Sequence, residues 1–126
     1  MNRLILFYLI VQISATYSCA QKSNGDYKNI DQHEFLRLMT QKDVVILDLR
    51  TPDEYNNDHI PNSKLVDYSS PNFNIEIDKL DKSKKYLVYC GAGGRSSKAA
   101  ALMGSKGFNS IYNLNGGFSS WSGPKE

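Results

Sequence analysis

The fold of this chain is organised around one stretch, Val88-Tyr89-Cys90-Gly91-Ala92-Gly93-Gly94-Arg95-Ser96-Ser97-Lys98-Ala99-Ala100-Ala101-Leu102. It starts as the end of a β-prone run, passes through a glycine-rich loop that a cysteine opens, and continues in an alanine-rich segment. This order predicts a buried strand, a tight loop and then a helix, which a Lys106-Gly107 C-cap signal ends. The glycines allow a tight turn that points successive N–H groups at one spot.

Cys90 is the candidate reactive residue. It stands just before a helix N-terminus and five residues before Arg95, and the amides and the cation both favour thiolate over thiol. The same groups can hold an anion that is attached to the sulfur or attacked by it. A lone cysteine after a strand is more often a small core residue, but here the glycines and Arg95 favour the reactive interpretation. The expected substrate-binding loop consists of Gly91, Ala92, Gly93, Gly94, Arg95 and Ser96.

The spacing of this loop distinguishes between two chemistries. Four residues separate Cys90 from Arg95, whereas five separate the two residues in tyrosine-phosphatase-like loops. The missing residue shortens the loop by roughly 3.5 Å. The tighter ring suits one extra sulfur atom on the cysteine and therefore favours a persulfide over a phosphocysteine.

The composition bounds the class of protein. With 126 residues and 14.2 kDa, the chain is expected to form one domain with a modest core. The net charge of +2 is spread without a basic run, so we expect no nucleic-acid partner. We also expect a monomer.

Residues 1–20 are typical of an export signal. Arg3 precedes the apolar run 4–11, which is too short to anchor the chain across a bilayer, and small residues follow. Two processing outcomes are open. Either a loose lipobox ends at Cys19, which would be lipidated and tether the protein to a membrane, or signal peptidase cuts after Ala20. The expected location is the periplasm or, as a lipoprotein, a membrane of a bacterial cell envelope.

Both outcomes leave Cys90 without a partner for an internal disulfide, and a free thiol in an exported protein suggests a functional one. Residues 21–29 are expected to form a polar tether, and residues 30–124 the folded domain.

Strands and helices alternate along the domain, which predicts an α/β fold with a mostly parallel sheet. Asp31 with Glu34 and Thr51 with Glu54 form capping-box patterns that start two helices. The expected helices cover about 31–41, 52–57, 70–80 and 96–106, with a short last one at 118–121; the expected strands cover 44–49, 64–67, 86–89 and 110–114. Cys90 and Asp48 then fall at the carboxyl ends of strands, where α/β proteins place their sites.

Four stretches in the family's order resemble a single rhodanese domain of the sulfurtransferase family. They are Leu47–Tyr55, His59–Ser63, the Cys90–Ser96 loop and Gly107–Phe118. The resemblance implies a three-layer fold with helices on both faces of the sheet. It also implies that Cys90 takes a sulfane sulfur from a donor such as thiosulfate, forms a persulfide, and passes the sulfur to cyanide or a thiol. Arg95 would orient the anionic donor, and no metal or organic cofactor is implied.

Many active members of the family carry a basic or bulky polar residue where this chain has Gly91. With fewer cations at the rim, thiosulfate should bind weakly, and a protein persulfide or polysulfide could be the donor instead. The supporting residues are interpreted as scaffold: Asp48 lies at a strand end, and Arg50 is expected to pair with Glu54. His59 is expected to be structural, and Phe118 and Trp121 to cover the core.

Three other functions compete with sulfur transfer. A non-catalytic binding or sensing module in the cell envelope would not need the reactive thiol. A phosphatase or arsenate reductase on the related fold is disfavoured by the four-residue spacing. A thiol redox protein would need a resolving cysteine, which the domain lacks.

Overall fold

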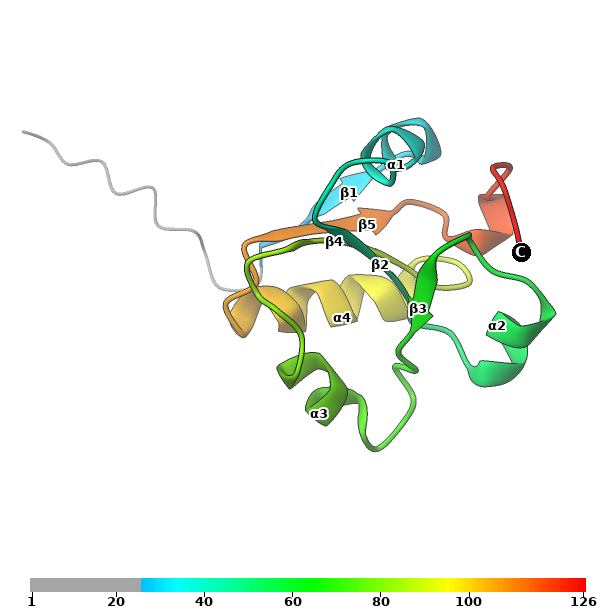
Figure 1. The fold of residues 1–126 in the computed structure, drawn as a ribbon. Coiled ribbons are helices and arrows are strands. Elements are labelled where there is room, and N and C mark those ends of the chain that lie inside the picture. Colours follow the sequence, from blue (N-terminus) through cyan, green and yellow to red (C-terminus); the bar gives the residue numbers. More distant parts are fainter. Residues whose placement is uncertain (1–25) are drawn as a thin grey trace, which may run out of the picture.

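In the computed structural model, residues 26–126 are described, and they form a sheet covered on both faces by helices (Figure 1). The elements, in chain order, are β1 (Lys28–Ile30), α1 (Gln32–Leu38), β2 (Val44–Asp48), α2 (Pro52–Asn57), β3 (Ser63–Leu65), α3 (Phe73–Asp78), β4 (Lys85–Tyr89), α4 (Gly94–Ser105), β5 (Ser110–Leu114) and a 3₁₀ turn, η1 (Phe118–Ser120). The α/β class expected from the sequence is confirmed.

The five strands of the described region run in the order β1-β5-β4-β2-β3, and every pairing is parallel. β4 is the central strand, and it is buried from Tyr86 onward, as a strand covered on both faces must be. The carboxyl end of this strand delivers Cys90 to the middle of one edge of the sheet.

Two apolar clusters hold the layers together. One packs α3 and α4 against the lower face of the sheet in Figure 1 and contains Phe73, Ala100 and Met103. The other packs α1 and the C-terminal segment against the upper face and contains Phe35 and Trp121. The core-covering role expected for Trp121 is confirmed, since its side chain is buried and its ring meets that of Phe35 edge to face, 5.4 Å between centroids.

The helix starts follow the capping patterns. Thr51 accepts a hydrogen bond from the Glu54 amide, and the Glu54 side chain accepts one from the Thr51 amide, so the capping box of α2 is complete. Asp31 accepts a hydrogen bond from the Glu34 amide at 2.9 Å and so caps α1. These short side-chain bonds satisfy N–H groups that a helix cannot satisfy itself.

The chain enters the sheet earlier than the sequence indicates. β1 takes in Lys28 and Asn29, which the sequence assigns to the polar tether, and pairs them with Tyr112 and Asn113 of β5. A three-residue edge strand with no apolar alternation carries no sequence signal, because its pairing with β5 is long-range. The proposed signal segment and Cys19 lie outside the described residues.

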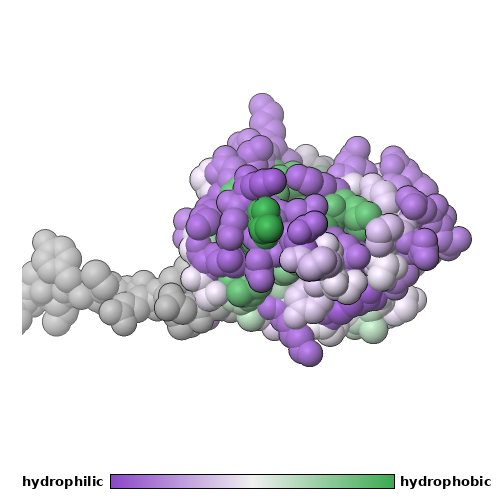
Figure 2. All heavy atoms as spheres, turned by 90° about the horizontal axis from the view of Figure 1, so that it is seen from below, coloured by the Kyte–Doolittle hydropathy of each residue, from purple (hydrophilic) through white to green (hydrophobic). Residues whose placement is uncertain are grey.

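The one face of residues 26–126 that Figure 2 draws is mainly polar. The face seen from below is largely hydrophilic, with small separated apolar areas (Figure 2). Ile75 on α3 is the one large hydrophobic side chain of the described region that is more than half exposed. No helix within residues 26–126 combines the length and the apolar character needed to cross a bilayer.

Candidate active site

The site is built around the sulfur of Cys90, which lies directly after β4 and is 1% exposed. The chain turns there into the loop 90–93 and then into α4, whose N-terminus faces the site. Gly93 has a φ of +106°, a left-handed conformation that glycine adopts without a steric penalty. This residue is where the loop reverses into the helix.

Three hydrogen-bond donors converge on this sulfur. The amide of Gly93 donates to Sγ at 3.1 Å, and the amide and the hydroxyl of Ser96 donate to it at 3.3 Å. All three donors belong to the loop or to the first turn of α4, so the sulfur lies in a ring of donors. Such a ring stabilises negative charge on sulfur, whether on a thiolate or on a persulfide.

Burial and hydrogen bonding act on this thiol in opposite directions. Burial raises the pKa of the Cys90 thiol, because it disfavours the charged form. The hydrogen bonds from the Ser96 hydroxyl and from the loop amides lower it, and together they outweigh burial, so the pKa of Cys90 lies below its ordinary value. The loop therefore holds an activated thiol.

The turn at residues 116–119 holds the loop through backbone hydrogen bonds. The amides of Phe118 and Ser119 donate to the carbonyls of Cys90 and Gly91 at 2.8 and 2.9 Å. Those carbonyls are thereby held by this turn. Gly117 makes the approach possible: its φ is +60°, and a Cβ there would lie 2.5 Å from the Cys90 carbonyl oxygen. The sequence signal for this support is the glycine pair Gly116-Gly117.

Arg95 and Glu54 form a forked ion pair at the outer side of the loop. Nη1 and Nη2 of Arg95 donate to Oε2 and Oε1 of Glu54 at 2.9 and 3.0 Å. Glu54 also accepts the amide and the hydroxyl of Thr51. The Arg95 guanidinium lowers the pKa of Glu54 to about 2, and the carboxylate in turn raises the pKa of Arg95.

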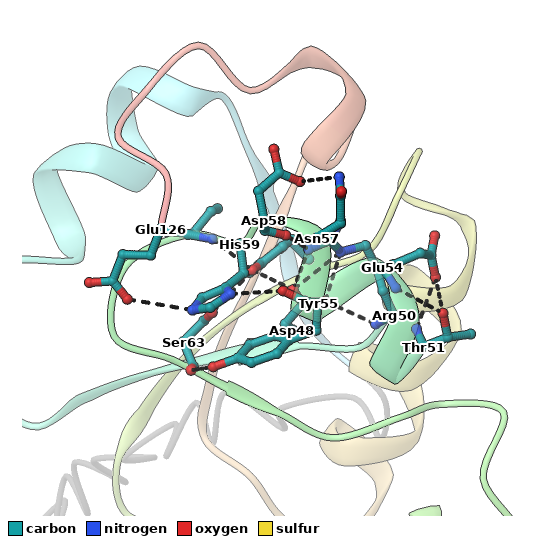
Figure 3. A network of polar contacts seen from close by, with 12 residues as sticks. Asp48, Arg50, Thr51, Glu54, Tyr55, Asn57, Asp58, His59, Ser63 and Glu126 are labelled. Carbon is teal, nitrogen blue, oxygen red and sulfur yellow. Dashed lines mark hydrogen bonds and ion pairs between the residues drawn. The ribbon is translucent and has the colours of Figure 1, made fainter.

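The expected pairing of Arg50 with Glu54 is wrong. Arg50 instead forms a buried ion pair with Asp48, with Nη2 2.7 Å from Oδ2, and also donates to the Asp58 carbonyl (Figure 3). The four-residue spacing of Arg50 and Glu54 suggests that they pair. In the structure, however, Glu54 is held at the start of α2 by Thr51 and pairs with Arg95. Asp48 and Arg50 therefore form one buried pair, whereas Glu54, on α2, pairs with Arg95.

Asp48 also joins β2 to β4. It is fully buried and accepts the hydroxyl of Tyr89, its register partner, at 2.6 Å. The Tyr89 hydroxyl accepts the Ile60 amide and contacts the Ser63 hydroxyl. Burial and the bond to Asp48 raise the pKa of Tyr89 far above its ordinary value, so it stays protonated.

The Asp48–Arg50 pair lies under the turn that holds the loop. The Arg50 guanidinium stacks on the ring of Phe118, 4.1 Å from its centroid, and the amide of Phe118 holds the Cys90 carbonyl. This pair is therefore linked to the loop through Phe118.

His59 lies outside the sulfur site, within the network of Figure 3. Its ring stacks on that of Tyr55 at 3.8 Å, and its Nδ1 is 2.9 Å from the Tyr55 carbonyl. Its backbone exchanges two hydrogen bonds with Glu126, which ties the C-terminal segment to this turn. The structural interpretation of His59 agrees with these contacts. Within residues 26–126, no group of three His, Cys, Asp or Glu side chains is placed to hold a metal ion.

Comparison with known proteins identifies the class. The model of the rhodanese-like domain family matches residues 31–124, and the chain belongs to that family. It is 38% identical over 101 residues to the thiosulfate sulfurtransferase GlpE of Coxiella burnetii, covering 75% of this chain and 87% of that protein. It is 33% identical over 97 residues to the GlpE protein of Pseudoalteromonas translucida, covering 75% and 89%.

A solved structure agrees. The crystal structure of a rhodanese-related protein from Thermoplasma volcanium superposes with a TM-score of 0.67 at 29% identity, covering 79% of this chain and 98% of that one. The three-layer fold implied by the resemblance is therefore confirmed.

Proposed function

We propose that this chain, a rhodanese-type sulfurtransferase, moves a sulfane sulfur from thiosulfate or a persulfide or polysulfide donor to a thiophilic acceptor through a persulfide on Cys90. The observation that carries the proposal is the ring of three donors around the Cys90 sulfur. A binding module has no need of a buried thiol whose pKa is lowered, so the ring favours the enzyme over the non-catalytic alternative.

The reaction has two balanced halves. The Cys90 thiolate attacks the outer sulfur of the donor; the Sγ–S bond forms, the donor's S–S bond breaks, and its electron pair leaves with sulfite or with the donor's thiolate. The acceptor, cyanide or a thiolate, then attacks the outer sulfur of the persulfide and Cys90 leaves as a thiolate. The loop amides and the Ser96 hydroxyl stabilise the anion at each stage.

Steady-state sulfur transfer tests this proposal. The folded domain should accelerate the formation of thiocyanate from cyanide with thiosulfate or a polysulfide as donor. Cys90→Ser should reduce the rate to that of the uncatalysed reaction. Hydrolysis of an aryl phosphate, measured alongside, should stay at background. Phosphate hydrolysis without thiocyanate formation would contradict the proposal and favour the phosphatase alternative.

We also propose that the chain is exported and tethered to a cell-envelope membrane by a lipid on Cys19, and that it acts as a monomer. The support for export is the apolar run 4–11 followed by small residues and a cysteine. The full chain expressed in a bacterium should incorporate labelled palmitate, and Cys19→Ala should not. Cleavage after Ala20 without label would favour the unlipidated outcome.

A further inference from the structure

The positive charge of the Arg95 side chain is balanced by an ion pair with Glu54. Its fork is bound end-on by Glu54 through two hydrogen bonds of 2.9 and 3.0 Å. The pKa of Arg95 is raised mainly by this carboxylate, and to a smaller extent by the Cys90 sulfur. The hydrogen-bond donors at the tip of the guanidinium, Nη1 and Nη2, are therefore both engaged by Glu54.

Gly91 and this ion pair fit together. A Cβ on residue 91 would lie 3.1 Å from Nη2 of Arg95 and 3.7 Å from Oε1 of Glu54. The volume in which a side chain would begin is thus bordered by the pair. A side chain at position 91 would crowd Nη2 of Arg95, which would have to shift by a few tenths of an ångström.

The consequence is that the charge of Arg95 beside the loop is balanced by a carboxylate. Arg95 is balanced by Glu54, and Arg50 is balanced by Asp48 in the buried layer beneath the loop. A dianion that binds beside the loop meets the Glu54 carboxylate and must compete with it for the guanidinium. A donor with one negative charge or none is repelled less by the Glu54 carboxylate when it approaches the same place.

We infer that Glu54 is a specificity-determining residue: by holding Arg95, it disfavours the thiosulfate dianion and directs Cys90 toward singly charged or neutral persulfides and polysulfides. The inference rests on the proposed function and names the donor class of the same site. The step is Cys90–S⁻ + HS–S⁻ → Cys90–S–S⁻ + HS⁻ for hydrogen disulfide. For thiosulfate it is Cys90–S⁻ + S–SO₃²⁻ → Cys90–S–S⁻ + SO₃²⁻.

The test measures sulfur uptake by Cys90 in single-turnover reactions, quenched and read by intact mass, with thiosulfate and with hydrogen disulfide as probes. We compare the rate constant of sulfur uptake from thiosulfate with that from hydrogen disulfide. Glu54→Gln should raise the ratio of the first to the second about fivefold, the effect of one partly exposed charge pair. The thiosulfate rate of this variant should also fall with added salt, because a freed cation attracts the dianion through solvent.

Two variants serve as controls. Glu76→Gln changes the net charge equally, on the separate helix α3, and should leave the ratio unchanged. Glu54→Asp keeps the negative charge on a shorter side chain, so its ratio should lie between those of the wild type and Glu54→Gln. Because Gln also completes a capping box, Glu54→Gln is expected to fold.

A measurement on the wild-type chain needs no variant. Sulfate, an unreactive dianion, should leave sulfur uptake from hydrogen disulfide unchanged at about 10 mM, a concentration well above the KM of many enzymes. Competitive inhibition by sulfate, or an unchanged ratio in Glu54→Gln, would overturn the inference while leaving sulfur transfer intact. Absence of sulfur uptake from every donor would instead overturn the proposed function.

Discussion

At the scale of single residues, Ser96 does more for the thiolate than the sequence suggests. Its amide and its hydroxyl both donate to the Cys90 sulfur at 3.3 Å, and its side chain is buried. The sequence places Ser96 in the loop because of its position after Arg95. It does not show that the hydroxyl turns back toward the sulfur, because a serine in the first turn of a helix has several possible acceptors.

Ser96→Ala should raise the pKa of Cys90, because it removes one hydrogen bond to the thiolate. The acid limb of activity should therefore move to higher pH, and turnover near neutral pH should fall about fivefold, the value of one net hydrogen bond of roughly 1 kcal/mol. The pH dependence of alkylation by iodoacetamide measures the pKa. Ser97→Ala is the matched control, since its hydroxyl donates to the Gly94 carbonyl instead. An unchanged alkylation profile in Ser96→Ala would contradict this account.

At the scale of elements, the support of the loop by the turn at 116–119 depends on a close approach of two backbones. Gly117→Ala places a Cβ against the carbonyl oxygens of Cys90 and Gly91 and adds strain at a φ of +60°. We expect a loss of at least about 2 kcal/mol in the free energy of unfolding and a larger loss of activity, since the loop must shift. Urea unfolding together with sulfur transfer measures both.

Gly94→Ala is the stability control for this prediction. A Cβ there meets nothing within 4 Å, and the residue begins α4. Its free energy of unfolding should stay within about 1 kcal/mol of wild type. A Gly117→Ala protein as stable as Gly94→Ala would show that the turn is not a close support of the loop.

The elements that sequence reasoning predicts well are those with local signals. The capping residues Asp31 and Thr51 fix where two helices begin, and the apolar runs fix β2 and β4 to within a residue or two. The failures are long-range. β1 depends on a strand more than eighty residues away, and Glu54 finds its partner 41 residues further on. Patterns of residues close in sequence do not predict either of these long-range partners, β5 and Arg95.

At the scale of the whole molecule, one buried polar network ties the layers to the site. Asp48 on β2, Tyr89 on β4 and Arg50 before α2 share hydrogen bonds, and Arg50 stacks under Phe118 (Figure 3 shows part of it). The sequence places Asp48 near the site correctly. Its partner could not be read from the sequence, since the choice depends on which carboxylate faces Arg50 after the sheet forms.

Asp48→Asn should destabilise the protein strongly. It leaves the buried Arg50 guanidinium without a charge partner, which costs about 3–5 kcal/mol in comparable sites. For a domain of this size the midpoint of thermal unfolding should fall by more than about 10 °C. Circular dichroism against temperature measures it. Stability within about 0.5 kcal/mol of wild type would show that Arg50 is held by its other contacts alone.

The persulfide on Cys90 is best tested by the intact mass of residues 21–126 after incubation with thiosulfate or with hydrogen disulfide, with Cys90→Ser as the control. We predict a gain of one sulfur atom on the wild-type chain, which cyanide removes and which the variant does not show. A folded protein with a free thiol that gains no sulfur from either donor would contradict this prediction.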